Sequence, residues 1–165
     1  MLCNELNGII DYLKSRDDMR FLQAATKEQI HKFETEKGVN LPSKYKEWLL
    51  FSDGGECFSP DGIQLYGVAH EPVIDVDNPI DNYIVIGALA SGESILCGKS
   101  GEIISIYNFD TGVIEGESYS DFSVFLKRLD DSQKGWLMRG KDLFLRGVKY
   151  AKENPVKATL TVVGV

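Results

Sequence analysis

The stretch GESILCGKS, residues 92–100, comes nearest in this sequence to a phosphate-binding loop. The P-loop motif is G-x-x-x-x-G-K-[ST], and the spacing from Gly92 to Gly98 is one residue too long for it. A P-loop also leads into a helix whose first amides hold the phosphate, whereas the following GEIISIYNF has the composition of a strand. The stretch therefore favours a strand and a turn over a nucleotide site.

Closely spaced carboxylates are the second residue type that could do chemistry, and Asp75 with Asp77 is an example. Paired carboxylates can bind a metal or transfer protons when a pocket shifts their pKa values or further ligands complete a shell. The calcium-loop order D-x-[DN]-x-[DN]-G fails at Pro79. We expect a solvated acidic loop with no metal and no cofactor. A carboxylate-based hydrolase stays open as the least favoured alternative.

Cysteine and histidine form no recognisable catalytic or metal-binding pattern. Cys3, Cys57 and Cys97 lie at wide, unequal spacings without a C-x-x-C motif, and His31 and His70 are far apart. A thiolate nucleophile would need a histidine that only the fold could bring close. We expect Cys57 and Cys97 to be small buried hydrophobic residues of a reduced, cytoplasmic protein.

Charge is distributed unevenly along the chain, whose net charge is −7. Residues 1–52 carry eight acidic and eight basic side chains, residues 53–121 carry thirteen acidic ones and one lysine, and residues 122–165 carry four acidic and nine basic ones. The middle segment thus has a charge of −12. Such a surface repels nucleic acid and steers basic partners, so we expect a protein partner. Alternatively, acidic loops only keep sheet edges from aggregating.

Length and hydropathy predict one folded domain that is not embedded in a membrane. The chain has 165 residues, of which 43% are hydrophobic and 26% charged, as is ordinary for a globular protein. The longest uncharged apolar run, residues 83–90, is too short to span a bilayer. We therefore expect a single domain over residues 1–165 and no membrane partner.

Helical periodicity dominates the first third of the chain. Apolar residues recur at helical spacing over residues 4–16, and TKEQ at residues 26–29 has the form of a capping box that starts a second helix. Gly38 can adopt the left-handed conformation that ends this helix. In LPSKYKEWLLFSDGG, residues 41–55, Pro42 is expected at the first helical position and Asp53-Gly54-Gly55 at the end of the helix.

After residue 55 the pattern changes to short apolar runs separated by Gly, Asp, Asn and Pro, which is typical of strands and turns. Two hairpin-type connections, at residues 91–93 and 110–112, favour antiparallel pairing. Residues 69–82 read as a long loop that is either functional or mobile. The predicted strands are Ile63–Val68, Tyr83–Leu89, Ser94–Cys97, Glu102–Phe109 and Val113–Glu117.

Helical spacing returns toward the carboxyl end. Ser120 is a plausible N-cap for a helix to about residue 129, and a second helix is expected over residues 132–153. The closing ATLTVVGV has strand-like composition. The predicted fold is therefore α+β, with N-terminal helices packed on a mostly antiparallel sheet of about five to six strands and followed by C-terminal helices.

The order of these motifs resembles the SUKH superfamily, which is named in part for yeast cell-wall assembly regulators. The resemblance rests on QIHKFE, Gly38, Leu41-Pro42-x-x-Tyr45-x-x-Trp48-Leu49, the Gly-Gly turn, Gly62-Ile63-x-Leu65-Tyr66, GEIISIYNFDTG and Ser120-x-Phe122-x-x-Phe125-Leu126. It covers a core of about residues 26–129. The 69–82 loop, the helix at 132–153 and the tail depart from the pattern.

The resemblance implies an α+β interaction domain without a shared catalytic site. Bacterial members of the superfamily resemble immunity proteins that neutralise toxins, often nucleases, and eukaryotic relatives act as scaffolds. We therefore expect a non-enzymatic immunity protein that covers a basic toxin domain with its acidic segment; the alternative is a scaffold or regulator of cell-envelope processes. The expected contact residues are Asp53, Glu56, Asp61, Glu71, Asp75, Asp77 and Asp81.

Overall fold

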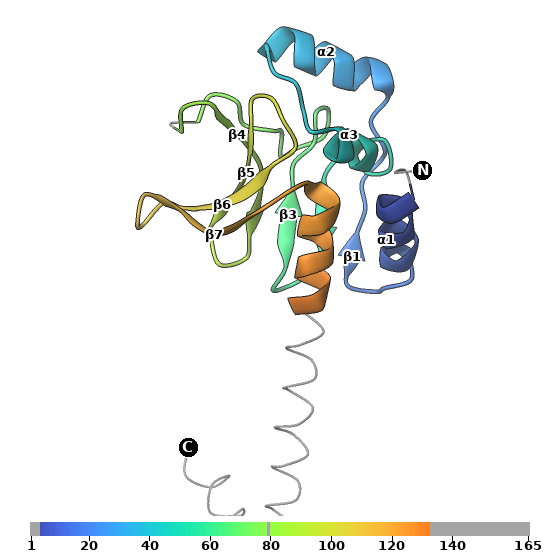
Figure 1. Ribbon diagram of the computed structural model, residues 1–165. Helices are drawn as coiled ribbons and strands as arrows, with labels where there is room; N and C mark the ends of the chain where they lie inside the picture. Colours follow the sequence, from blue (N-terminus) through green and yellow to red (C-terminus); the bar gives the residue numbers. More distant parts are fainter. Residues whose placement is uncertain (1–3, 79, 133–165) are drawn as a thin grey trace, which may run out of the picture. The chain divides into compact units, whose positions relative to one another are not determined.

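Short helices and an antiparallel sheet build the molecule in the computed structural model, which describes residues 4–78 and 80–132 (Figure 1). The chain begins α1 (Asn4–Lys14), β1 (Met19–Arg20), α2 (Lys27–Lys37) and α3 (Ser43–Leu49). It continues with β2 (Gly55–Cys57), β3 (Ile63–Leu65), β4 (Tyr83–Leu89), β5 (Ser94–Gly98), β6 (Ile104–Asn108) and β7 (Val113–Tyr119). A fourth helix occupies residues 122–132. The α+β class is therefore confirmed.

The sheet is a meander in which strands β1 to β7 follow one another in sequence order, each antiparallel to its neighbours. It has seven strands, whereas five to six were predicted. The additional strands are β1 and β2, with two and three residues, which are too short to show a period-two pattern. Strands β4 to β7 agree closely with prediction, while β3 ends at Leu65 instead of residue 68.

Helix α2 begins and ends as its sequence predicts. The Thr26 side chain accepts a hydrogen bond from the Gln29 amide at 3.1 Å, and the Gln29 side chain accepts one from the Thr26 amide at 2.8 Å. Gly38 closes the helix with a φ of 63°. This capping box is local, which explains why four residues of sequence suffice to place it.

The glycine pair after α3 has a different role from the predicted one. The helix ends at Leu49, before Asp53-Gly54-Gly55, and Gly55 already belongs to β2. A Cβ on Gly54 would lie 2.7 Å from the Leu65 carbonyl oxygen, and one on Gly55 2.6 Å from that of Arg20. These glycines therefore allow strands to approach closely, and they do not terminate the helix.

The starts of two helices also differ from expectation. Pro42 is the N-cap of α3 and not its first helical residue. The helix of residues 122–132 is capped by Asp121, which accepts hydrogen bonds from the amides of Ser123 and Val124, and not by Ser120. Asp121 is the better cap because an ionised carboxylate also interacts favourably with the positive end of the helix dipole.

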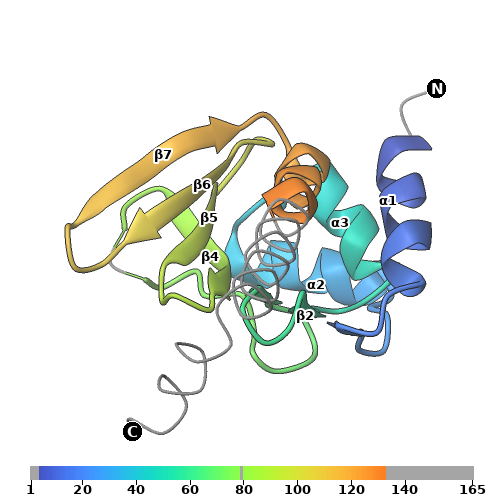
Figure 2. The ribbon, with the colours of Figure 1, turned by 90° about the horizontal axis from the view of Figure 1, so that it is seen from below.

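The core lies between the helices and one face of the sheet (Figure 2). Tyr45, Trp48 and Phe122 are fully buried, and the Trp48 and Phe122 rings meet edge to face at 5.9 Å. The buried Tyr45 hydroxyl donates to the carbonyl oxygens of Tyr66 and Ile86. Each large side chain buried in this way stabilises the fold by roughly 1.5–3 kcal/mol.

Residues up to Leu129 form one compact unit. No helix of the part that the structure describes is both long and apolar enough to cross a bilayer. The helix predicted at residues 132–153 lies almost entirely outside the described residues, and the tail at 158–165 lies wholly outside them.

Candidate functional site

Asp53, the first of the predicted contact residues, is a buried anchor for the chain that follows β3. Its side chain has no exposure. One carboxylate oxygen accepts from the Val68 amide at 2.7 Å, and the other accepts from the amides of Ala69 and His70 at 2.9 and 2.8 Å. The Nδ1 atom of His70 lies 2.9 Å from the same oxygen. The prediction that Asp53 contacts a partner is therefore wrong, because its acceptors are used inside the fold.

Two further acids of the −12 segment are also structural. Glu102 accepts from the Ser43 amide at 2.8 Å and so caps the start of α3, 59 residues away in sequence. Burial raises the pKa of Asp121, but hydrogen bonds from the Ser123 side chain and from the Ser123 and Val124 amides bring the net pKa below its ordinary value. These carboxylates stabilise helix starts, which sequence reasoning missed for Glu102 because its partner is remote.

Glu56 and Glu71 are the two predicted residues that the fold brings to one place. Both line a small cavity of about 120 Å³ together with Arg20 and Gln64. The Arg20 guanidinium lies 3.6 Å from the Glu56 carboxylate, and both side chains remain partly in solvent. An exposed pair of this kind contributes little stability. The Glu56 carboxylate therefore remains available to a cation from another molecule.

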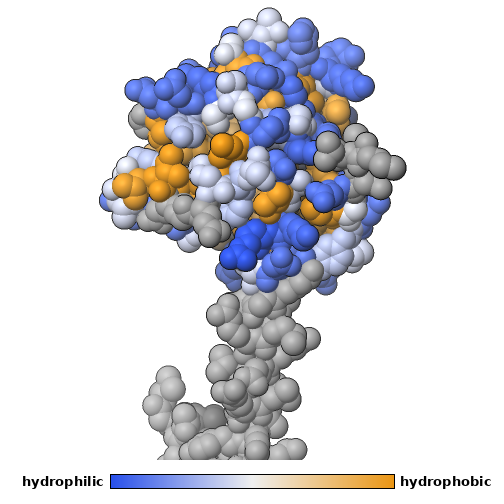
Figure 3. Space-filling view, viewed as in Figure 1, coloured by the Kyte–Doolittle hydropathy of each residue, from blue (hydrophilic) through white to orange (hydrophobic). Residues whose placement is uncertain are grey.

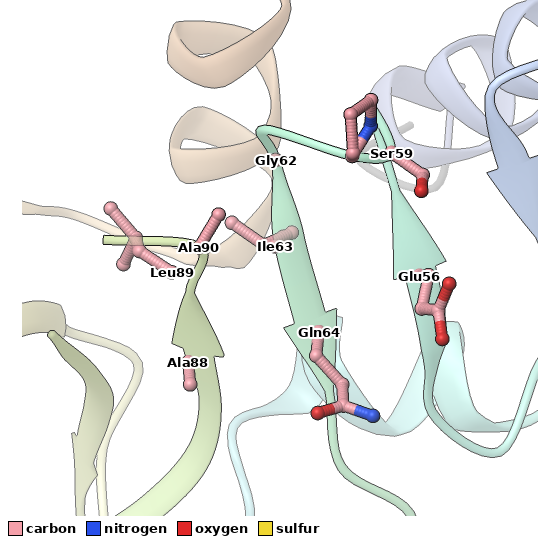
Figure 4. A pocket seen from close by; sticks show the side chains of 9 residues that line it. Glu56, Ser59, Gly62, Ile63, Gln64, Ala88, Leu89 and Ala90 are labelled. Atoms are coloured by element: carbon pink, nitrogen blue, oxygen red, sulfur yellow. The ribbon is translucent and has the colours of Figure 1, made fainter. Parts of the chain in front are cut away.

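A second cavity, of about 220 Å³, adjoins the first because both include Glu56 and Gln64. In Figure 4 the side chains of Glu56, Gln64 and Ala88 stand on three neighbouring strands, and the small Ala88 leaves space beside Gln64. We call these two cavities together the polar trough: its charged and polar side chains are Arg20, Glu56, Glu71, Gln64 and Ser59, and the rest of its lining is aliphatic, proline, alanine or glycine. Gln64 was missed in the sequence because a lone amide on a short strand carries no pattern.

The remaining predicted residues lie outside the trough's lining. Asp61 is exposed in the turn between β2 and β3, next to Gly62 at the rim. Asp75, Asp77 and Asp81 are exposed on the loop between β3 and β4.

That loop is organised by its own side chains. Asp75 accepts from the Asp77 amide at 2.9 Å, and its backbone pairs with Val85 of β4. Asn78 donates to the carbonyl oxygens of Asp75 and Tyr83 and accepts from the Ile80 amide. Asp75 and Asn78 thus organise this part of the loop, and Asp75, Asp77 and Asp81 lie outside the lining of the trough.

The P-loop-like stretch and the cysteines, which were the other candidates for chemistry, have structural roles. GESILCGKS forms β5 and the turn before β6, so no helix follows the glycine, as predicted. Cys57 and Cys97 are buried, which raises the pKa of both thiols, that of Cys57 to about 12. Among residues 4–78 and 80–132, no three His, Cys, Asp or Glu side chains come together as metal ligands would.

Comparison with known proteins agrees with the order of elements. The family model of the SMI1 / KNR4 family (SUKH-1) matches residues 24–128. This range nearly coincides with the core of about 26–129 on which the sequence resemblance rests. A search of curated proteins gives no match. The matched range contains all the strands after β1 and every predicted contact residue.

Proposed function

This chain belongs to the SMI1 / KNR4 family (SUKH-1), and from that premise we propose that it is a non-catalytic immunity protein that binds and neutralises a toxin with a basic surface. The family makes toxin immunity or regulation of cell-wall assembly the kind of function to consider. A nuclease is the toxin class that fits the charge best, because its substrate groove must attract phosphates and would equally attract carboxylates.

The observation that carries this proposal is the amount of acidic surface left after the structural acids are removed. Asp53, Glu102 and Asp121 are used inside the fold. Eight acids of the same segment have exposed or half-exposed side chains: Glu56, Asp61, Glu71, Asp75, Asp77, Asp81, Glu93 and Asp110. Lys99 is the one lysine or arginine between residues 53 and 121. The excess of negative charge therefore lies where a partner can meet it.

These charges act mainly on the rate of encounter. An exposed ion pair contributes about 0–1 kcal/mol, so eight scattered carboxylates do not by themselves give a tight complex. A surface of one sign can raise an association rate by orders of magnitude at low salt, and salt screens the effect. For an inhibitor that must reach its toxin before the toxin reaches its substrate, a fast encounter is the useful property.

The test uses the purified product of the gene adjacent to the one that encodes this chain. Its association rate is measured by stopped flow between 20 and 300 mM NaCl, for the wild type and for Glu56→Gln/Asp61→Asn/Glu71→Gln. We expect roughly a tenfold slower association of the triple variant at low salt and a weaker salt dependence. Glu28→Gln/Glu36→Gln, two exposed acids of α2 outside the acidic segment, is the matched control.

Two results would contradict this proposal. One is association that does not depend on salt. The other is binding that depends on the basic residues 122–165 and is indifferent to the acidic segment. If the adjacent gene encodes no toxin and its product does not bind, the scaffold or cell-envelope regulator becomes the better reading of the family. The hydrolase alternative has only Glu56 and Glu71 in a shared cavity to support it, and among the described residues no cluster of three His, Cys, Asp or Glu side chains adds to this pair.

A further inference from the structure

The hairpin of β6 and β7 exposes apolar side chains. Phe109 is 54% exposed, Val113 51% and Ile114 39%. Figure 3 shows hydrophobic surface gathered where this hairpin projects from the molecule. Monomeric proteins scatter single apolar residues over their surface, but a group of them on one element indicates an interaction site.

Tyr107 joins Phe109 and Ile114 into one patch. Its ring meets the Phe109 ring edge to face at 4.9 Å, and its cross-strand partner in the β6–β7 register is Ile114. Directly opposed residues of an antiparallel pair point to the same face, so Tyr107, Phe109 and Ile114 form a continuous surface. We call Tyr107, Phe109 and Ile114 the hairpin patch; Val113, which pairs with Asn108, is exposed on the other face of the hairpin.

The tip that carries the patch is held by its own hydrogen bonds. The Asn108 side chain accepts from the amides of Asp110 and Thr111, and the Gly112 amide donates to the Asn108 carbonyl oxygen at 2.9 Å. Gly112 has a φ of 70°, a conformation that glycine adopts without strain. A patch fixed in this way loses little conformational entropy when a partner covers it.

The strand register connects the hairpin patch to the polar trough. Successive cross-strand partners run from Ile114 and Tyr107 through Ser94 and Ala88 to Gln64 and Glu56. Paired residues share a face, so this row crosses the sheet from an apolar end at the hairpin to Glu56 in the trough, whose register partner on β1 is Arg20. The centre of the row is made of two small side chains, of which Ser94 is buried and Ala88 is partly exposed.

The charge of the residues around this row indicates which kind of molecule covers it. Residues 100–121, which include the hairpin, carry five acidic residues and no lysine, arginine or histidine. A second copy that placed its own hairpin on this row would bring acidic segments together, which is unfavourable. A partner with lysines or arginines around an apolar pocket is complementary to the hairpin patch and to the carboxylates of Glu56 and Glu71.

We propose that the hairpin patch is the apolar anchor of the interface, inserted into a pocket of a basic partner protein whose cationic side chains face Glu56 and Glu71. This inference rests on the proposed function and adds to it the place and chemistry of the contact. The patch supplies affinity by burying aromatic and aliphatic surface, while the acids supply the encounter rate. Substitutions in the patch therefore act on dissociation, and substitutions of the acids act on association.

The first experiment measures binding of the adjacent gene's purified product to Phe109→Ser and Ile114→Ser. Each variant is expected to bind at least tenfold more weakly through faster dissociation. Ile103→Ser is the matched control, because Ile103 is 59% exposed, apolar and outside the patch. If both patch variants bind like the wild type while the wild type binds tightly, this inference is overturned and the proposed function stands.

A second experiment does not depend on the toxin. The isotope-labelled full chain is titrated with an eight-residue peptide of alternating lysine and leucine, and with one of alternating lysine and serine. We expect amide shifts at residues 107–114 with the lysine-leucine peptide alone. Equal shifts with both peptides, or none at the hairpin, would refute the apolar anchor. A wild-type dimer that Ile114→Ser converts to a monomer would also refute it, because a second copy would then cover the patch.

Discussion

Replacing Asp53 by asparagine tests the reassignment of this residue from a contact to an anchor. Asparagine has nearly the same shape, but it offers one acceptor oxygen where the carboxylate offers two. With its oxygen toward Ala69 and His70, the amide group would face the Val68 N–H, so that two donors oppose each other. Because the side chain is fully buried, water cannot replace the lost interaction.

The expected cost follows from the number of bonds affected. One hydrogen bond to a charged group is lost, at about 1.5–3 kcal/mol, and the others are weakened because their acceptor is now neutral. We expect the free energy of unfolding to fall by about 3 kcal/mol. For a chain of this length, that corresponds to a melting temperature lower by roughly 6–12 °C.

The assay is urea denaturation followed by tryptophan fluorescence, with amide hydrogen exchange at residues 68–70 as a local readout. Asp61→Asn is the matched control, since this aspartate is exposed in a turn, and it should change stability by less than about 0.5 kcal/mol. Gly67→Ala should also destabilise the fold. A Cβ at position 67 would lie 2.8 Å from the Asp53 carboxyl carbon and would disturb the same anchor. Our reasoning fails if Asp53→Asn is as stable as the control and exchange at 68–70 is unchanged.

Two further predictions concern ionisation. A hydrogen bond from Arg16 lowers the pKa of Asp18, so the pair stabilises the fold above the unfolded-state pKa and its contribution is lost as the pH falls through the lower folded value. Asp18→Asn should therefore cost about 1 kcal/mol in urea melts at pH 5–8 and less below pH 4, and a cost that grew on acidification would contradict this. Burial raises the pKa of Cys57 to about 12 and raises that of Cys97 as well. In a Cys3→Ser background, iodoacetamide at pH 8 should leave both thiols unmodified until denaturant is added, and rapid labelling of the native protein would show that they are accessible.

Much of the fold could be predicted because its determinants are local. The capping box at Thr26, the left-handed Gly38 and strand β4 were each readable within a few residues, and all three are present. The prediction that Gly54 and Gly55 end the helix was wrong because the absence of a side chain in glycine suits either a helix end or a close strand contact. Only the position of the Leu65 and Arg20 backbones distinguishes the two.

The sequence by itself determined the α+β class, the family order of the elements and the concentration of acids between residues 53 and 121, since periodicity, capping and charge are properties of neighbouring residues. The tertiary structure alone decided which acids are used inside the fold and which stay exposed. Asp53 meets amides 15 to 17 residues away and Glu102 caps a helix 59 residues away, so both are used internally. Glu56 and Glu71 share a cavity, and the hairpin patch stays in solvent, because strand register and packing fix distances that spacing along the chain does not contain.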